Sequence, residues 1–287
     1  MGRTRIILPL LFALLPLAAF TAEPQSDVTK VRLAGRTGIV VEGLIEKTRR
    51  ATIMLDTGAS CSVIRSALAD KLKLRTLRDN VEFISLDRPV RRPLVVVNFV
   101  RLGPICRPVV CLAGDVSQGI DLILAIDVLK AYAFTVDYEH GWLLFGPGDS
   151  LEHSVVFDNS RDLAVVPLGI GTRGIRVLLD SGASYLGLFE SKVKDWLQTG
   201  GWRFESLARG VSSYRRGMTI QAGDVVFAGV TIPALKATIL ESDPGSGASL
   251  DWDGYLGLNC LNARRVRFDF PNHIFSWEPY RASKRED

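Results

Sequence analysis

Two short stretches of the sequence share one pattern, in which an aspartate is followed by a hydroxyl residue, glycine, alanine and serine. The first reads Asp-Thr-Gly-Ala-Ser at 56–60, and the second reads Asp-Ser-Gly-Ala-Ser at 180–184. Each follows an apolar run, ATIML in the first case and IRVLL in the second. Residues of these types also occur together in ordinary turns. The repeated flanking residues favour a matched pair of sites over two unrelated turns.

The two aspartates, Asp56 and Asp180, could do acid–base chemistry together. Two carboxyl groups held close to each other cannot both ionise cheaply, so they share one proton. The ionised member can take a proton from water, while the protonated member polarises a carbonyl group. The pair therefore predicts hydrolysis of an amide bond by an activated water molecule.

The two motifs belong to a longer internal repeat. Two further pairs of blocks match in the same order: ILAIDVL at 123–129 with YLGLNCL at 255–261, and 134–145 with 266–277. A repeat of this length indicates duplicated domains. A loop-forming cluster of glycine, proline, aspartate and serine at 146–150 separates the halves. We expect a first lobe over residues 27–148 and a second lobe over residues 149–280.

Each half consists mainly of short apolar, β-branched runs, which are typical of strands. The expected strands are 38–46, 51–56, 81–86, 93–102 and 105–112 in the first half, and 163–170, 175–180, 218–221, 224–228 and 230–240 in the second. Short helices are expected at 66–74, 127–132, 191–197 and 259–263. The predicted class is all-β, with two similar β-barrel lobes, short helices and the active site in the cleft between the lobes.

On these motifs the chain resembles the retropepsin-like aspartic proteases, in a form with two fused lobes, over residues 30–280. In that family the aspartate motif is followed much later by two apolar residues and a glycine. YLG at 255–257 matches this pattern, whereas ILA at 123–125 has alanine in place of glycine. The resemblance implies that each lobe has a retropepsin- or pepsin-like barrel and that Asp56 and Asp180 are the catalytic residues.

The resemblance also implies roles for the neighbours of the two aspartates. Thr57 and Ser181 would hydrogen-bond across the lobe interface and hold the two loops together. Gly58 and Gly182 would let each loop turn tightly beside its partner. The final serine of each motif would either support its loop from below or form a local turn hydrogen bond.

Proteases of this kind close hairpins over an extended peptide, and the turns at 86–92 and 211–217 are the candidates here. Tyr214 is either an aromatic residue of such a flap or an exposed loop residue. Both turns are rich in arginine. This fits either a preference for acidic residues near the cut or a solvated loop, because charged tips are common on exposed hairpins.

The N-terminus has the pattern of an export signal. Arg3 and Arg5 precede an apolar run from Ile6 to Phe20, and small and polar residues follow. This order is typical of a secretory signal peptide, and an uncleaved membrane anchor is the alternative. We expect residues 1–22 to be a signal peptide or an anchor and the protein to be periplasmic or secreted. Any contact with a membrane would be made through residues 6–22.

Other classes of protein are disfavoured. The formal net charge is only +4 over 287 residues, and the basic residues are scattered, so nucleic-acid binding is not expected. The three histidines and four cysteines show no metal-binding spacing, and we expect no metal and no cofactor. None of the histidines lies in a motif typical of a serine or cysteine protease.

The cysteines are Cys61, Cys106, Cys111 and Cys260. An exported protein could oxidise them. Cys61 directly follows the first motif, and both a free buried thiol and a disulfide are open to it. Cys106 and Cys111 lie on or beside one strand, and a straight strand would not let them bridge each other.

The sequence as a whole predicts an exported aspartic-type endopeptidase, a hydrolase that cuts protein or peptide substrates bound in an extended conformation. It would act as a single chain, since each half supplies one aspartate. The alternative is a relative of these proteases that binds a peptide or a partner in the cell envelope without cutting it. The intact aspartates favour the enzyme, and Ala125 favours the binding protein.

Overall fold

The computed structural model describes residues 29–34, 38–85, 88–158, 162–196, 204–210, 213–240 and 251–280. The predicted signal peptide or anchor lies outside these residues. Among the helices of the described ranges, none is long and apolar enough to cross a membrane.

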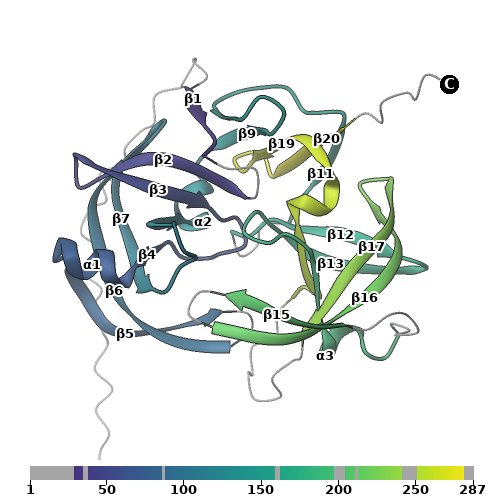
Figure 1. The fold of residues 1–287 in the computed structure, drawn as a ribbon. Coiled ribbons are helices and arrows are strands. Elements are labelled where there is room, and N and C mark those ends of the chain that lie inside the picture. The colour runs from purple at the N-terminus through teal and green to yellow at the C-terminus, as the bar shows by residue number, and fades with distance from the viewer. Residues whose placement is uncertain are drawn as a thin grey trace, which may run out of the picture.

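Six strands of the first half form a closed β-barrel (Figure 1). In order around the ring they are β2 (Ile39–Ile45), β3 (Arg49–Leu55), β8 (Leu122–Leu124), β4 (Val63–Arg65), β7 (Ile105–Gly114) and β6 (Arg88–Leu102). The pairing of β2 with β6 closes the ring, with Leu44 opposite Arg101 and Ile45 opposite Val100. A further strand, β5 (Arg75–Ser85), pairs with β6 outside the ring.

The second half builds a barrel of the same design. Its ring consists of β12 (Val165–Ile170), β13 (Arg173–Asp180), β18 (Gly254–Gly257), β14 (Leu186–Phe189), β17 (Val230–Leu240) and β16 (Ser213–Phe227). The pairing of β12 with β16 closes it, with Gly169 opposite Val226 and Ile170 opposite Val225. Strand β15 (Phe204–Gly210) pairs with β16 outside the ring. The prediction of an all-β fold with two similar barrels is confirmed.

A third sheet is shared by the two halves. Its strands are, in order, β1 (Thr29–Arg32), β10 (Trp142–Phe145), β9 (Ala133–Asp137), β19 (Ala263–Asp269), β20 (Ile274–Pro279) and β11 (His153–Val156). The halves meet in its middle, where β9 pairs with β19 and Phe134 lies opposite Phe268. These two rings are 5.3 Å apart between centroids and fully buried, so apolar packing joins the halves here.

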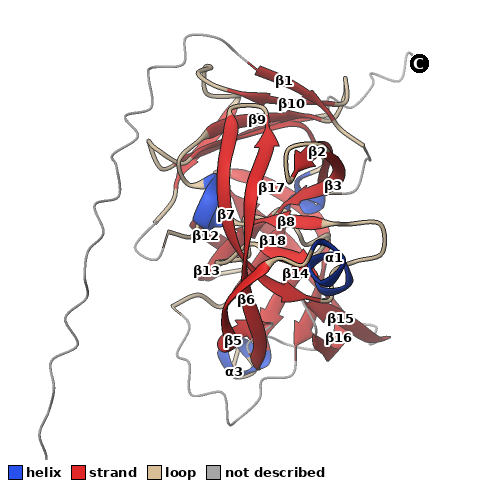
Figure 2. Cartoon of the chain, turned by 90° about the vertical axis from the view of Figure 1, so that its left-hand side faces the viewer, coloured by secondary structure: helices blue, strands red, loops and turns tan. Residues whose placement is uncertain are grey.

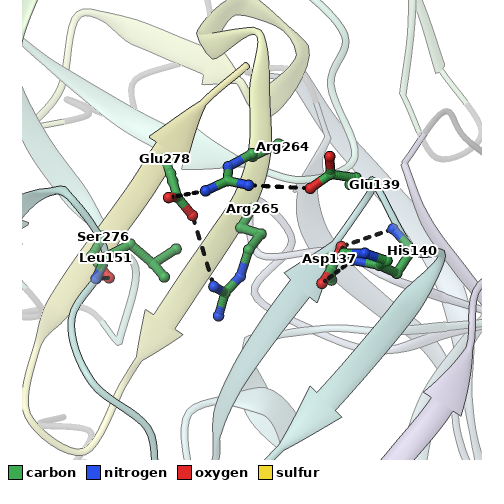
Figure 3. Close-up of polar contacts among 8 residues, drawn as sticks. All are labelled: Asp137, Glu139, His140, Leu151, Arg264, Arg265, Ser276 and Glu278. Atoms are coloured by element: carbon green, nitrogen blue, oxygen red, sulfur yellow. Dashed lines mark hydrogen bonds and ion pairs between the residues drawn. The ribbon is translucent and has the colours of Figure 1, made fainter. Parts of the chain in front are cut away.

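Ion pairs add a polar connection across the shared sheet (Figure 3). Arg264 on β19 pairs with Glu139, in the turn between β9 and β10, at 3.2 Å, and also with Glu278 on β20. Arg265 lies 3.7 Å from the same Glu278. Partly exposed pairs of this kind contribute little to stability, so the buried aromatic side chains carry most of the stability of this sheet.

The two halves repeat the same strand register. Leu55 at the end of β3 lies opposite Leu124 on β8, and Leu179 on β13 lies opposite Leu256 on β18. These residues occupy matching places in the two repeats of the sequence. The duplication is therefore present in the pairing of the strands, and it brings both aspartate motifs to equivalent ends of equivalent strands.

The helices are short: α1 (Ser66–Leu72), α2 (Ile126–Leu129), α3 (Glu190–Val193) and the 3-10 helix η1 (Leu258–Leu261). Helix α1 ends before the predicted residue 74 because Lys73 takes a left-handed backbone conformation, with φ of 52°. Helix α3 begins one residue earlier than predicted and ends at Val193, before the predicted end at Leu197, because the chain continues as a turn from Lys194.

One sequence prediction about the strands is wrong. Residues 218–221 and 224–228 were expected to form two strands, but β16 runs unbroken through Gly223 to Phe227. The pairing of β16 with β17 shifts register on both sides of Gly223, whose φ is +82°. Glycine tolerates this conformation, so the irregularity is absorbed as a bulge and the strand continues.

Two long hairpins extend from the barrels, β5–β6 from the first and β15–β16 from the second. Figure 2 shows both at the end of the molecule that lies opposite the shared sheet. Each hairpin comes from the equivalent part of its own lobe. The fold therefore has two candidate flaps, one per lobe.

Candidate active site

The two aspartates lie where equivalent strands end at the interface between the barrels. Asp180 is the last residue of β13, and Asp56 directly follows β3. The adjacent strand residues Leu55 and Leu179 are fully buried, which anchors both loops in the barrel cores. Burying one such leucine contributes about 1.5–3 kcal/mol. The two aspartates are partly exposed as whole residues, and their carboxyl groups lie between the two loops, each against the glycine of the opposite motif.

Thr57 and Ser181 join the two loops through reciprocal hydrogen bonds. The Thr57 hydroxyl donates to the Leu179 carbonyl at 2.8 Å, and the Ser181 hydroxyl donates to the Leu55 carbonyl at 2.8 Å. Each hydroxyl oxygen also accepts the backbone N–H of the other residue at 3.0 Å. Both side chains are buried, so these bonds are shielded from water. The arrangement fixes the two aspartate loops relative to each other.

The glycine of each motif lies against the aspartate of the other. A β-carbon on Gly58 would lie 2.6 Å from either carboxylate oxygen of Asp180, and one on Gly182 would lie 2.6 Å from Oδ2 of Asp56. Real β-carbons do not approach oxygen this closely. Glycine is therefore required at both positions for the carboxyl groups to face each other.

Each carboxylate is also held by its own loop. Oδ1 of Asp56 accepts the N–H groups of Gly58 at 2.9 Å and Ala59 at 3.1 Å. Oδ1 of Asp180 accepts the equivalent N–H groups of Gly182 and Ala183, at 2.7 and 3.1 Å. The Oδ1 oxygens of Asp56 and Asp180 are thus fixed in the same way in both lobes.

The electrostatics of the pair favour one shared proton. Burial raises the pKa of Asp56, and hydrogen bonds from its loop and from Asp180 oppose this rise. Burial raises the pKa of Asp180 further, well above its usual range, and the negative charge of Asp56 adds to the effect. Both pKa values are therefore raised, and the two carboxyl groups titrate as a pair that holds one proton between them.

This arrangement can activate water without a metal ion. In the described part of the chain, no group of three or more His, Cys, Asp or Glu side chains is placed to hold a metal. One ionised and one protonated carboxyl group supply a base and a hydrogen-bond donor at the same place. A family model described as aspartyl protease matches residues 41–128, which include Asp56.

The barrel of the first lobe is thus an aspartyl protease family domain. The match runs from β2 to α2. The second lobe carries the same strand register, and its aspartate accepts the equivalent N–H groups of its own loop. A search among curated proteins finds no match.

Ala125, the last residue of ILA at 123–125, fits its place in the first lobe although the second lobe has glycine at the matching position. Ala125 is fully buried, and its N–H donates to the hydroxyl oxygen of Ser62 at 3.1 Å. In the second lobe, a β-carbon on Gly257 would lie 2.6 Å from the Ala183 carbonyl oxygen. The two lobes therefore hold their aspartate loops by different contacts, and only the second requires glycine.

The final serines of the motifs, Ser60 and Ser184, are exposed. Of the two alternatives for these serines, support of the loop from below does not fit, because an exposed side chain cannot lie beneath its loop. In the first lobe the buried Ser62 has that place, and its hydroxyl donates to Asp127 at 2.7 Å. The sequence carried a signal for this pair, since Asp127 is an acidic residue inside an otherwise apolar block.

A pair of tyrosines beside Asp180 was also not anticipated. The hydroxyl groups of Tyr185 and Tyr255 are 2.7 Å apart, and the two rings meet edge to face. A β-carbon on Gly187 would lie 2.6 Å from Cε2 of Tyr255, so this glycine makes room for the ring. The first lobe has Cys61, Val63 and Ile123 at the matching places. The walls beside the two aspartates therefore differ in chemistry.

All four cysteines lie in the described part of the chain, and all are free. Of the two alternatives for Cys61, the structure has the free thiol, and burial raises its pKa to about 11. Cys106 and Cys111 lie on one strand, β7, as expected, and do not bridge each other.

The candidate flaps are described only in part. Their tips at 86–87 and 211–212 lie outside the described residues, as does the side chain of Tyr214. In the first hairpin, Arg91 pairs with Glu82 at 3.1 Å, and Arg92 lies 3.7 Å from Asp115. Neighbouring acidic residues thus offset part of the positive charge of the first hairpin, on which the alternative of a preference for acidic substrates depends.

Proposed function

We propose that this protein is an exported aspartic endopeptidase that cuts extended peptides with a water molecule activated by Asp56 and Asp180. The observation that carries the proposal is the reciprocal contact at the lobe interface. Each aspartate lies against the glycine of the opposite motif, and the two carboxyl groups compete for one proton. A protein that only bound peptides would not need two carboxyl groups held in this arrangement.

One proton shared by the two carboxyl groups supports a division of labour, which we propose with Asp56 as the base and Asp180 as the acid. The ionised Asp56 takes a proton from water as the water oxygen attacks the peptide carbonyl carbon. The protonated Asp180 donates a hydrogen bond to the carbonyl oxygen and then its proton, which gives a neutral tetrahedral diol. The proton on Asp56 next moves to the peptide nitrogen, and Asp180 takes back a proton as the carbon–nitrogen bond breaks. The two carboxyl groups end in their starting states.

The strand architecture supports an extended substrate. Two hairpins, β5–β6 and β15–β16, extend from the lobes, and an extended peptide can pair with strands through its backbone. Export is proposed from the basic and apolar order of residues 1–22. The substrate would then be a protein or peptide of the cell envelope or the exterior.

The test is incubation of the purified protein with a diverse peptide library, beside the Asp56→Asn variant. Wild-type cleavage that the variant loses is the expected result, because a neutral amide cannot act as the base. A statine-type inhibitor should block cleavage. Peptides that bind the wild type and are recovered intact would instead assign the protein to the non-cutting relatives.

A further inference from the structure

The loop that carries Asp56 is held by a short platform from the same lobe, residues 124–127. The Asp56 N–H donates to the Leu124 carbonyl at 2.9 Å, and the Ile126 N–H donates to the Ala59 carbonyl at 3.1 Å. The third attachment is made by Ser62, at the far end of the loop. The position of Asp56 therefore depends on three contacts with one segment.

The third attachment differs between the lobes. In the second lobe the Gly257 N–H donates directly to the Tyr185 backbone carbonyl at 3.0 Å. The backbone there is so close that a β-carbon on Gly257 would lie 2.7 Å from the Tyr185 nitrogen. In the first lobe the Ala125 N–H donates instead to a side chain, the hydroxyl of Ser62. A hydroxyl reaches beyond its own backbone, which leaves room for the alanine methyl group.

Asp127 fixes the direction of that hydroxyl. The Ser62 hydroxyl donates to Oδ1 of Asp127 at 2.7 Å, and the Ser62 N–H donates to Oδ2 at 3.2 Å. A serine hydroxyl has one proton, so donating it to the carboxylate turns a lone pair toward the Ala125 N–H. The matching residues of the second lobe, Leu186 and Asn259, cannot make this arrangement, because leucine has no hydroxyl group.

We infer that Ser62 and Asp127 are positioning residues for Asp56, and that this pair holds the first lobe at Ala125 as the direct backbone contact of Gly257 holds the second. The inference rests on the proposed function for its kinetic consequence. The structural part of the inference is independent of the proposed function, because the contacts on Ala125 and on the loop exist whether or not the protein cuts peptides.

The surroundings of Asp127 act on its pKa in opposite directions. Burial raises the pKa of Asp127 above its ordinary value, although the two bonds from Ser62, the N–H of Val128 and the charge of Arg107 oppose the rise. The neighbouring thiols of Cys61 and Cys111 both have raised pKa values, mainly through burial, and Asp127 adds to each rise. These thiols therefore stay neutral and bring no competing charge to the carboxylate.

The kinetic test compares Ser62→Ala, Asp127→Ala and Asp127→Asn with the wild type. The two alanine variants should lower kcat by tenfold to a hundredfold, on the order expected for a misplaced catalytic group, with KM changed less than about twofold. Asp127→Asn should recover most of kcat, since an amide oxygen still accepts the Ser62 hydroxyl. Asn259→Ala, at the exposed matching site of the second lobe, is the control and should keep the wild-type rate.

Two features of the design separate positioning from simple loss of folded protein. Rates are divided by the number of active sites, titrated with a tight statine-type inhibitor. The double variant Ser62→Ala/Asp127→Ala should cost no more than either single variant, because the two groups act through one contact. Independent, additive losses or an unchanged kcat in Ser62→Ala would overturn the inference, while an inactive wild type would count against the proposed function.

A measurement without activity keeps the inference testable in either case. Amide hydrogen exchange should become faster in peptides covering 56–62 and 124–128 of Ser62→Ala, because the Ala125 N–H loses its acceptor. Peptides covering 180–186 in the second lobe are the internal control and should exchange as in the wild type. Equal protection of residues 124–128 in wild type and variant would contradict the positioning role.

Discussion

Gly58 in the first lobe lies in direct contact with the carboxyl group of Asp180 in the second. The reciprocal contact joins Gly182 to Asp56. Neither glycine has a positive φ, so neither is required by backbone conformation. Each is required because the space where a β-carbon would stand is filled by a carboxylate of the other lobe.

We expect Gly58→Ala to abolish peptide cleavage. The added carbon would lie 2.6 Å from both oxygens of Asp180, so the carboxyl groups must move apart and lose their shared proton. Gly174→Ala is the control, because a β-carbon there meets nothing within 4 Å. Cleavage of one good peptide, with circular dichroism to check folding, measures the effect. Near wild-type turnover in Gly58→Ala would contradict the contact.

Replacing Asp180 by asparagine should stabilise the protein near neutral pH. The fold raises the pKa of Asp180 well above its usual range, so it favours the protonated form. The protonated carboxyl group therefore contributes its full share to the free energy of unfolding below the ordinary carboxyl pKa, about 4. This contribution is lost as pH rises through the raised pKa of Asp180 in the folded protein. An asparagine cannot ionise, and its amide oxygen can still accept the loop N–H groups.

Thermal unfolding of wild type and Asp180→Asn at pH 3 and pH 7 tests this sign. The variant should melt higher at pH 7, by about 2–4 °C for each kcal/mol gained, and should show little gain at pH 3. Asp180→Ala, which removes the acceptor as well, is the comparison. A variant that melts lower than wild type at pH 7 would contradict a raised pKa for Asp180 in the folded protein.

The pH–rate profile should move to lower pH when a hydroxyl is added beside either aspartate. Burial raises the pKa values of Asp56 and Asp180. The N–H groups of Ala59 and Ala183 already donate to the Oδ1 atoms of these two aspartates. A serine hydroxyl at either position can donate one more bond to the ionised form and lower the pKa of the pair. Profiles of Ala59→Ser and Ala183→Ser beside the wild type measure the shift, and an unmoved acid limb would rule this explanation out.

Removing the Ser181 hydroxyl should destabilise the contact between the lobes. Ser181→Ala leaves the Leu55 carbonyl without its donor and the Thr57 N–H without its acceptor, both in a buried place. Each buried polar group left unpaired costs about 1–3 kcal/mol. Chemical denaturation should therefore show a loss of about 2–6 kcal/mol. Ser184→Ala, at an exposed serine of the same motif, is the matched control and should change little.

Activity per molecule should not depend on protein concentration. Both aspartates come from one chain and meet within it, so no second copy is needed to build the pair. Specific activity measured from micromolar to nanomolar enzyme should be constant. A steep fall on dilution, reversed by concentrating the sample, would mean that assembly of two chains is required.

Much of the fold could be predicted because its signals are local. Apolar, β-branched runs predicted most of the barrel strands, and β2 and β17 begin and end within one residue of the expected limits. The shared sheet was not predicted, since pairing of β9 with β19 joins segments from opposite halves. The bulge at Gly223 was likewise not predicted, because glycine within an apolar run indicates the end of a strand as long as the pairing of that strand is unknown.

The sequence by itself determined that two aspartates stand in matched motifs on matched strands, because motif, flanking residues and repeat order are all properties of the chain. Only the tertiary structure decided how those motifs are held. The contact of Ser62 with Asp127 spans 65 positions, and the contact of Thr57 with Ser181 spans 124. No local pattern encodes such contacts, since closure of the barrels and packing of one lobe against the other bring the partners together.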